Sequence, residues 1–510
     1  MKRYNRINRK RRSVFNISLS LIGQIIAVLA GMLLPRVLMT NYGSETNGMV
    51  SSIQQAVGYL TLIEGGLLST VAVKLYKPLA DGDTEYVNQI LSSSKRYYSR
   101  TGLKFCIALI CIGVLYPIIT AETQYSYFQT FLIVVLLGMN GVTQICFIGK
   151  YKALLMAAQL NGIILAINAG ATALYAIILM LFANVGLGIV ESLAIAVSAY
   201  LIRALAFYIA VMKLLPQYRF DLSETNVTFP KRKEALSTQI LGMCALNGGM
   251  IVMTVCKAPM EQISVYSTYS LVLSALFMLT YCVENSVTSV LGDISVREGQ
   301  EHLQKIYEQF DSLYQMFWTV LCSCLFALLL PFISIYTKGI SDALYVLPIE
   351  SSMFACVGAL WILRNESTLL LTAKGEFQAM RKSMVIETLL VLVLGCLLYL
   401  KWDLKGLLMA KIIATVFSFV SLTKVTYSKV LMLNTNGKLK RVLVSCGCIA
   451  AVIIASNALS SYIAISSMLG WLFYACMIAL VAVFVVIVAW TTILRQETKS
   501  CFQLFFKKKR

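Results

Sequence analysis

The chain has 510 residues, a mean hydropathy of +0.75 and only 13% charged residues. A soluble protein of this length would need more polar residues to cover its surface, so the composition excludes that class and predicts a polytopic membrane protein. The formal net charge of +20 is compatible with nucleic-acid binding, but the placement of the basic residues along the chain favours membrane topology instead.

About fourteen apolar segments are long enough to span a bilayer as helices. In chain order they cover residues 14–39, 48–73, 101–120, 127–148, 153–183, 187–212, 235–256, 263–291, 315–336, 343–372, 384–400, 404–423, 442–462 and 467–494. The predicted fold class is therefore all-α.

A surface helix with one apolar stripe is predicted between the second and third spans. Its apolar residues recur with helical spacing and are Val87, Ile90, Leu91 and Tyr98. The same pattern returns 216 residues later at Leu303, Ile306, Tyr307 and Tyr314. Upstream of each copy, an apolar helix carries one carboxylate, Glu64 or Glu284. Chance alternation of apolar helices and basic loops is the alternative to a true repeat.

The repeat predicts two homologous lobes of six helices each. The N-terminal lobe covers residues 12–216 and the C-terminal lobe 217–433, while residues 434–510 add two helices and a basic tail. With the N-terminus in the cytoplasm, most of the 44 Lys and Arg residues lie in cytoplasmic segments. Both termini are therefore predicted to be cytoplasmic, with the tail Lys507–Arg510 close to anionic lipid headgroups.

Most of the fourteen cysteines lie inside predicted spans, where a thiol behaves as a small apolar group. The single histidine, His302, is far from the Cys-X-Cys pairs, so no metal site is predicted. No phosphate-binding loop occurs, which excludes ATP-driven transporters. No cofactor is expected.

Ionisable residues within the spans are few, and each costs on the order of 3 kcal/mol at mid-span. The predicted substrate-binding cations are Arg203, Arg364, Arg36 and Lys411, and the predicted coupling or gating carboxylates are Glu64, Glu284, Glu366 and Glu387. Together with amide side chains such as Asn140 and Gln144, they predict a central aqueous cavity. The alternative is that they snorkel or form packing ion pairs, for example Arg203 with Glu64.

Three stretches in the first 105 residues carry a family resemblance: Arg36–Gly48, Ile63–Gly66 and Lys77–Asp83. They resemble the bacterial polysaccharide (O-antigen, Wzx-type) flippases of the multidrug/oligosaccharidyl-lipid/polysaccharide exporter superfamily. The resemblance implies two six-helix lobes around a central cavity, in the bacterial cytoplasmic membrane. It also implies flipping of undecaprenyl-pyrophosphate-linked oligosaccharide to the outer leaflet. The related peptidoglycan-precursor flippases carry several early arginines, whereas this sequence has only Arg36 there.

Two other function classes remain open. A multidrug antiporter shares the lobes but usually has twelve spans and an acidic, apolar cavity. A membrane-embedded polymerase would need catalytic acids in a large outer loop, and the predicted outer loops are short, so the chain is predicted not to be an enzyme. The expected partners are the lipid-linked oligosaccharide, membrane lipids, a coupling H⁺ or Na⁺ and other polysaccharide-assembly proteins. Arg203 and Arg364 are predicted to capture the pyrophosphate.

Overall fold

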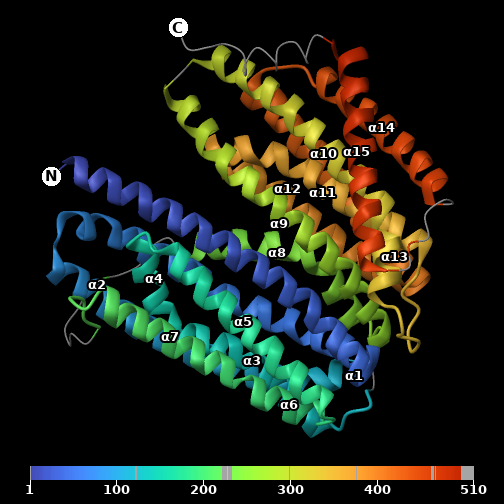
Figure 1. Cartoon of the computed structure of the whole chain (residues 1–510). Coiled ribbons are helices and arrows are strands. Elements are labelled where there is room, and N and C mark those ends of the chain that lie inside the picture. The colour runs from blue at the N-terminus through green and yellow to red at the C-terminus, as the bar shows by residue number, and fades with distance from the viewer. Residues whose placement is uncertain are drawn as a thin grey trace. The chain divides into compact units, whose positions relative to one another are not determined.

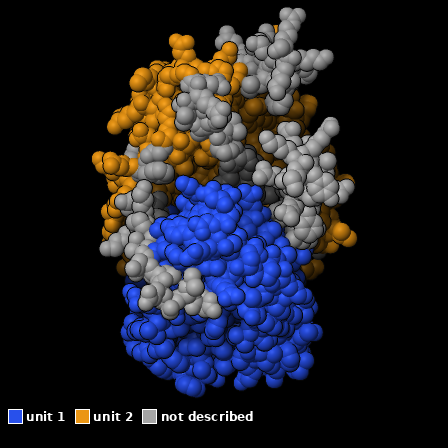
Figure 2. Space-filling view, turned by 90° about the vertical axis from the view of Figure 1, so that its left-hand side faces the viewer, with its two compact units in different colours: residues 1–264 blue, residues 265–510 orange. Residues whose placement is uncertain are grey.

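The computed structural model describes residues 2–120, 123–220, 227, 232–297, 299–374, 376–460, 465 and 467–495. All regular elements in these ranges are helices, which confirms the predicted all-α class (Figure 1). The chain divides into two compact units, residues 1–264 and 265–510, coloured separately in Figure 2. Each unit is described by itself.

The described residues of unit 1 form eight α-helices, one π-helix and the start of a ninth α-helix. They are α1 (Lys2–Asp81), α2 (Thr84–Ile119), α3 (Tyr127–Thr143), η1 (Gln144–Ile148), α4 (Gly149–Ala157), α5 (Asn161–Asn184), α6 (Ile189–Ala196), α7 (Ser198–Leu214), α8 (Arg232–Val255) and the first turn of α9 (Met260–Arg297).

Unit 2 contains the rest of α9 and the helices that follow it. These are α10 (Gln300–Tyr336), α11 (Pro348–Lys374), α12 (Phe377–Leu389), η2 (Leu390–Leu394), α13 (Gly395–Lys424), η3 (Val425–Leu431), α14 (Asn436–Ser460) and α15 (Met468–Thr492).

Most of the predicted spans coincide with helical segments, but the predicted span 153–183 is interrupted between α4 and α5, where Gln159 has a φ of 61°, and 187–212 is divided between α6 and α7. In the described part of the chain, ten helical stretches are long and apolar enough to cross a membrane. Two of them contain a break: α1 leaves helical geometry at Gly43, with φ 88°, and α13 does so at Trp402 and Asp403. Each therefore holds two predicted spans. A positive φ suits glycine, which explains why the first break falls at Gly43.

The predicted surface helices are not separate elements, because each continues into the next span. Residue 84 starts α2, where the Asp83 side chain caps the helix by accepting a bond of 2.9 Å from the Tyr86 N–H, and the helix runs unbroken to Ile119. Likewise, α10 runs from Gln300 to Tyr336. The charged residues between stripe and span lower hydropathy without interrupting the helix. The stripe itself is buried, with Val87 and Ile90 at 0% exposure.

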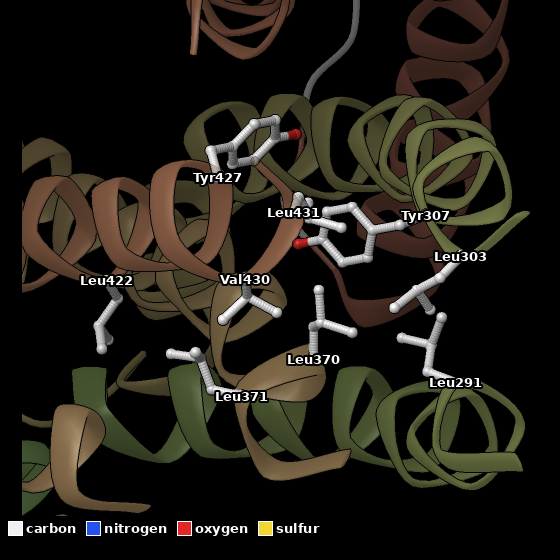
Figure 3. Packing of buried hydrophobic residues seen from close by; sticks show 9 residues of the cluster. All are labelled: Leu291, Leu303, Tyr307, Leu370, Leu371, Leu422, Tyr427, Val430 and Leu431. Carbon is white, nitrogen blue, oxygen red and sulfur yellow. The ribbon is translucent and has the colours of Figure 1, made fainter. Parts of the chain in front are cut away.

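Unit 2 contains an apolar cluster (Figure 3). It gathers side chains from α9, α10, α11, α13 and η3, namely Leu291, Leu303, Tyr307, Leu370, Leu371, Leu422, Tyr427, Val430 and Leu431. Two members of the repeated stripe, Leu303 and Tyr307, lie in this cluster, so the stripe of α10 is a packing face.

Gly48 marks the closest approach of α1 to the start of α9. A Cβ atom at Gly48 would lie 1.8 Å from the Met260 carbonyl oxygen, and next to it Asn47 Nδ2 donates to Ser264 Oγ at 2.6 Å. Because the obstacle is backbone, we expect Gly48→Ala to lower unfolding stability by about 3 kcal/mol. Thermal unfolding of the purified protein in detergent measures this.

Gly31 provides the matched control on the same helix. Apart from the backbone of its own helix, no atom of the described residues lies within 4 Å of its would-be Cβ, so Gly31→Ala is expected to be neutral or to stabilise α1 by up to about 1 kcal/mol. Equal melting temperatures for Gly48→Ala and wild type would contradict the close approach.

Candidate functional site

Unit 1 contains a cavity of about 640 Å³ that combines apolar walls with charged groups. Its lining comes from α1, α3, η1, α4 and α7. The ionised side chains that line it are Glu64, Lys152 and Arg203. Glu64 and Arg203 were predicted as cavity residues from widely separated spans, and the structure brings them together.

Glu64 is held from η1. The Gln144 Nε2 donates to Glu64 Oε1 at 3.1 Å, and Glu64 is only 6% exposed. Gln144 is the first residue of the π-helix that follows α3. A π-helical turn is wider than an α-helical one and is frequent at functional sites. The amide thus gives one carboxylate oxygen a fixed partner within the cavity.

Arg203 on α7 is positioned by the end of α3. Its Nη2 donates to the Asn140 carbonyl oxygen and to Thr143 Oγ1, both at 3.2 Å. The guanidinium also lies over the Tyr200 ring, 5.3 Å from the centroid. Its buried Nε–H has no hydrogen-bond partner among the described residues. The side chain is therefore held in one orientation, and its Nε–H remains available to donate a hydrogen bond to a ligand.

The ion pair between Arg203 and Glu64, suggested as an alternative by the sequence, is not formed. Within the described ranges, no nitrogen of Arg203 lies within 4.0 Å of a Glu64 oxygen, although the two charges still interact electrostatically. Each group is bonded to a neutral partner instead, Gln144 or Asn140 and Thr143.

Lys152 also lines the cavity, although its place in the sequence did not predict this. It falls between the predicted spans 127–148 and 153–183, where a lysine is expected to lie in a solvent-exposed loop. The structure instead continues the helix through α4 to Ala157, which places Lys152 in the cavity wall, where it acts electrostatically on Glu64. The cavity therefore holds two cations and one carboxylate.

In unit 2, Arg364 on α11 is engaged in a buried ion pair. Its Nη2 lies 2.8 Å from Glu387 Oε2 on α12, its Nε donates to Ser418 Oγ on α13 at 2.8 Å, and its guanidinium packs over the Trp361 ring. Arg364 is 3% exposed and Glu387 0%. This is the packing arrangement that the sequence analysis left open for these two residues.

Glu284 on α9 lies close to that pair. The Tyr314 hydroxyl donates to Glu284 Oε1 at 2.9 Å, and the Asn365 amide and the Arg364 charge also act on the carboxylate. Like Glu64, Glu284 has a neutral hydrogen-bonding partner from a neighbouring helix. The two carboxylates related by the sequence repeat thus have related surroundings in their respective units.

Glu366, two residues after Arg364, belongs to a second buried network. Its Oε1 accepts from the Tyr307 hydroxyl at 3.0 Å, and its Oε2 pairs with Lys438 on α14. Lys438 also pairs with Asp311 on α10 at 2.6 Å, and Arg441 reaches the other Asp311 oxygen at 3.2 Å. Asp311, Lys438 and Arg441 were not predicted as site residues.

Of the remaining predicted cations, Arg36 does not join the unit 1 cavity, whereas the charge of Lys411 acts on Glu387 in unit 2. Arg36 is half-buried on α1 and is not among the residues that line the unit 1 cavity. Lys411 on α13 donates to the Tyr266 hydroxyl at 2.9 Å and lies over that ring. In unit 1, Arg203 is therefore the predicted cation that lines the cavity, together with Lys152, which was not predicted.

No protein-family model and no curated protein matches the sequence. Solved structures do match. A structure described as "Lipid II flippase MurJ, inward closed conformation" is similar over 95% of this chain and 99% of its own, with a TM-score of 0.68 and 15% identity. An inward-facing multidrug resistance MATE family transporter of the MOP superfamily covers 81% of this chain and 98% of its own, with a TM-score of 0.60 and 12% identity.

A third match is the MATE multidrug transporter DinF-BH in complex with R6G. It covers 83% of this chain and 97% of its own, with a TM-score of 0.58 and 14% identity. At such identities the likeness concerns the fold alone, and the chain has the fold of these solved structures.

Proposed function

We propose that the protein flips undecaprenyl-pyrophosphate-linked oligosaccharide across the bacterial cytoplasmic membrane by alternating access, during surface polysaccharide biosynthesis. The observation that carries this proposal is the unit 1 cavity, in which Lys152 and Arg203 outnumber the single carboxylate Glu64. A net positive, partly apolar compartment at membrane depth suits an anionic headgroup better than a cationic drug.

Moving the headgroup through the membrane is costly. A pyrophosphate with about two negative charges and a chain of sugar hydroxyls cannot cross hydrocarbon without polar partners. Arg203 stays charged when desolvated and presents its donors in a fork that fits phosphate oxygens. Lys152 adds a second, more mobile charge.

The proposed orientation follows from the basic residues of the sequence. Both termini and the basic loops lie in the cytoplasm, so the carrier is loaded from the cytoplasmic leaflet. The coupling ion is H⁺ or Na⁺, and other polysaccharide-assembly membrane proteins receive the flipped product.

A multidrug antiporter is the second candidate, because two of the similar structures are multidrug transporters and Glu64 supplies a buried carboxylate. One pair of assays separates the candidates. The full chain is expressed in a strain lacking its own oligosaccharide-lipid flippase and in a strain lacking its main drug-efflux pumps. Restored surface glycan without added drug resistance is expected. Drug resistance without restored glycan would establish the antiporter instead.

Glu64 and Glu284 are proposed to couple transport to protons, since a buried carboxylate can load a proton on one face and release it on the other. We expect Glu64→Gln to keep the Gln144 contact region intact but to remove most of the pH dependence of transport, and Glu284→Gln to act in the same direction. Initial rates of carrier flipping in proteoliposomes between about pH 6 and pH 8 measure this.

Glu191→Gln is the control for charge removal alone, because Glu191 lies in the first turn of the short helix α6 and is absent from the cavity lining. It is expected to leave the pH profile unchanged. Wild-type pH profiles in both Glu64→Gln and Glu284→Gln would end the coupling proposal.

A further inference from the structure

The network at the start of α14 contains four ionised side chains that are almost entirely withdrawn from solvent. Asp311 and Glu366 are 0% exposed, Lys438 2% and Arg441 4%. Lys438 pairs with both carboxylates, and Arg441 Nη2 lies 3.2 Å from Asp311 Oδ2. Two carboxylates and two basic side chains balance in formal charge, which is the condition for burying such groups at tolerable cost.

Neutral side chains complete the hydrogen bonding around these charges. Gln315 accepts from Lys438 at 3.1 Å, the Tyr427 hydroxyl donates to Asp311, and the Tyr307 hydroxyl donates to Glu366. Tyr307 and Tyr427 also belong to the apolar cluster of Figure 3, so the charges adjoin a packed core. The network is therefore specific in both geometry and charge.

Both anions of this network belong to α10 and α11, and both cations belong to α14. Further contacts continue along the same helices: Gln315 Nε2 donates to Ser445 Oγ on α14 at 3.0 Å, and Trp490 on α15 packs with Cys448 of α14. The charges of this interface are therefore segregated: the face formed by α10 and α11 carries the carboxylates, and α14 carries the basic side chains.

The internal repeat shows what is special about this face. The shift of 216 residues that aligns the two apolar stripes places Asp311 on Lys95. Lys95 is exposed on α2, whereas Asp311 is completely buried beneath α14. The half of the chain that carries two additional helices thus has an anion where the other half has a solvated cation.

We infer that Asp311 and Glu366 form an intramolecular docking site whose ligand is the start of α14, through Lys438 and Arg441. The site fixes α14 and α15 on the α10–α11 pair, so that these four helices move as one body. Lys438 and Arg441 are therefore buried in this interface and do not contribute to the basic surface that faces the cytoplasm. This inference stands on the contacts alone, and only its transport readout rests on the proposed function.

A double-mutant cycle in the full chain tests the site. Lys438→Met leaves a buried excess of negative charge and Asp311→Asn a buried excess of positive charge, so each is expected to lower the melting temperature by about 5–10 °C in detergent. The double variant Asp311→Asn/Lys438→Met restores the balance of formal charge but leaves Glu366 and Arg441 without their ion-pair partners, so it is expected to lose clearly less than the sum of the two single losses. Where a single variant gives too little protein, the monodisperse fraction on size-exclusion chromatography replaces the melting temperature.

Lys405→Met is the matched control, because the pair of Lys405 with Glu350 is 3.7 Å long and Lys405 is half-exposed. It is expected to leave the melting temperature unchanged. If the effects of Asp311→Asn and Lys438→Met simply add in the double variant, the docking site is refuted.

Transport supplies the second readout. The double variant is expected to flip the carrier at the wild-type rate, because docking is preserved. A double variant that is stable but inactive would show that these charges act in the transport cycle, and would overturn the docking role. If wild type itself shows no flipping, the proposed function fails while the melting-temperature cycle still decides the docking site.

Discussion

Arg203→Ala is expected to abolish surface glycan in a strain that depends on this protein for flipping. The guanidinium is held in the unit 1 cavity by hydrogen bonds to Asn140 and Thr143. Its Nε–H has no partner among the described residues and can therefore donate to a phosphate oxygen. Losing a pair of charge-assisted hydrogen bonds costs about 3 kcal/mol, which weakens headgroup binding about 100-fold. Quantitative blotting of surface glycan at matched expression measures the effect.

The fold should survive this change. Thr143 Oγ1 still donates to the Asn140 carbonyl oxygen at 3.0 Å, so neither partner of Arg203 is left unpaired. Arg203→Lys is expected to give only partial rescue, since an ammonium group cannot make two parallel bonds to phosphate. Lys213→Ala, an exposed position on the same helix, is the control and should behave as wild type. Normal glycan in Arg203→Ala would place the capture site elsewhere.

Lys152 lines the same cavity and shows what hydropathy cannot predict. Hydropathy locates apolar helices well, although it missed the interruption between α4 and α5 within the predicted span 153–183. It cannot decide whether a lysine at a span boundary faces solvent or a cavity, because that depends on where the helix stops. Here the helix continues through η1 and α4, and Lys152 turns into the cavity wall.

Asp311 and Lys438 show the same limit for buried ion pairs. In the sequence, Lys438 and Arg441 belong to a basic stretch before a span, the usual sign of a cytoplasmic loop. Asp311 sits on a helix with many polar residues. Nothing in either stretch indicates that Asp311 and Lys438, which are 127 residues apart, form a contact of 2.6 Å. By contrast, Glu64 and Arg203 could be predicted, since an isolated charge within a long apolar run is costly unless it faces a cavity or a polar partner.

Arg364 is the residue for which the two interpretations from the sequence lead to opposite results. As a capture residue it would have to leave Glu387, to which its Nη2 is bound at 2.8 Å, in order to bind phosphate. As a packing residue it stays paired. The charged groups that face this pair are Glu284 on α9 and Lys411 on α13.

We expect Arg364→Met alone to destabilise the protein by about 3–5 kcal/mol, because it leaves the Glu387 carboxylate buried without its cation. The double variant Arg364→Met/Glu387→Gln should recover most of that loss, since a neutral amide at position 387 leaves no unpaired charge in the interior. Thermal unfolding of the two variants beside Lys405→Met gives the stability part of the answer.

Flipping by the recovered double variant then separates the roles. Full transport by Arg364→Met/Glu387→Gln would establish a packing pair and leave Arg203 and Lys152 as the cations that meet the pyrophosphate. A variant that is as stable as wild type but transports at less than about one tenth of its rate has lost more than about 1.4 kcal/mol of transition-state or binding free energy. Such a loss would mean that the guanidinium exchanges Glu387 for the substrate during the cycle, which makes the ion pair a closed state of the capture site.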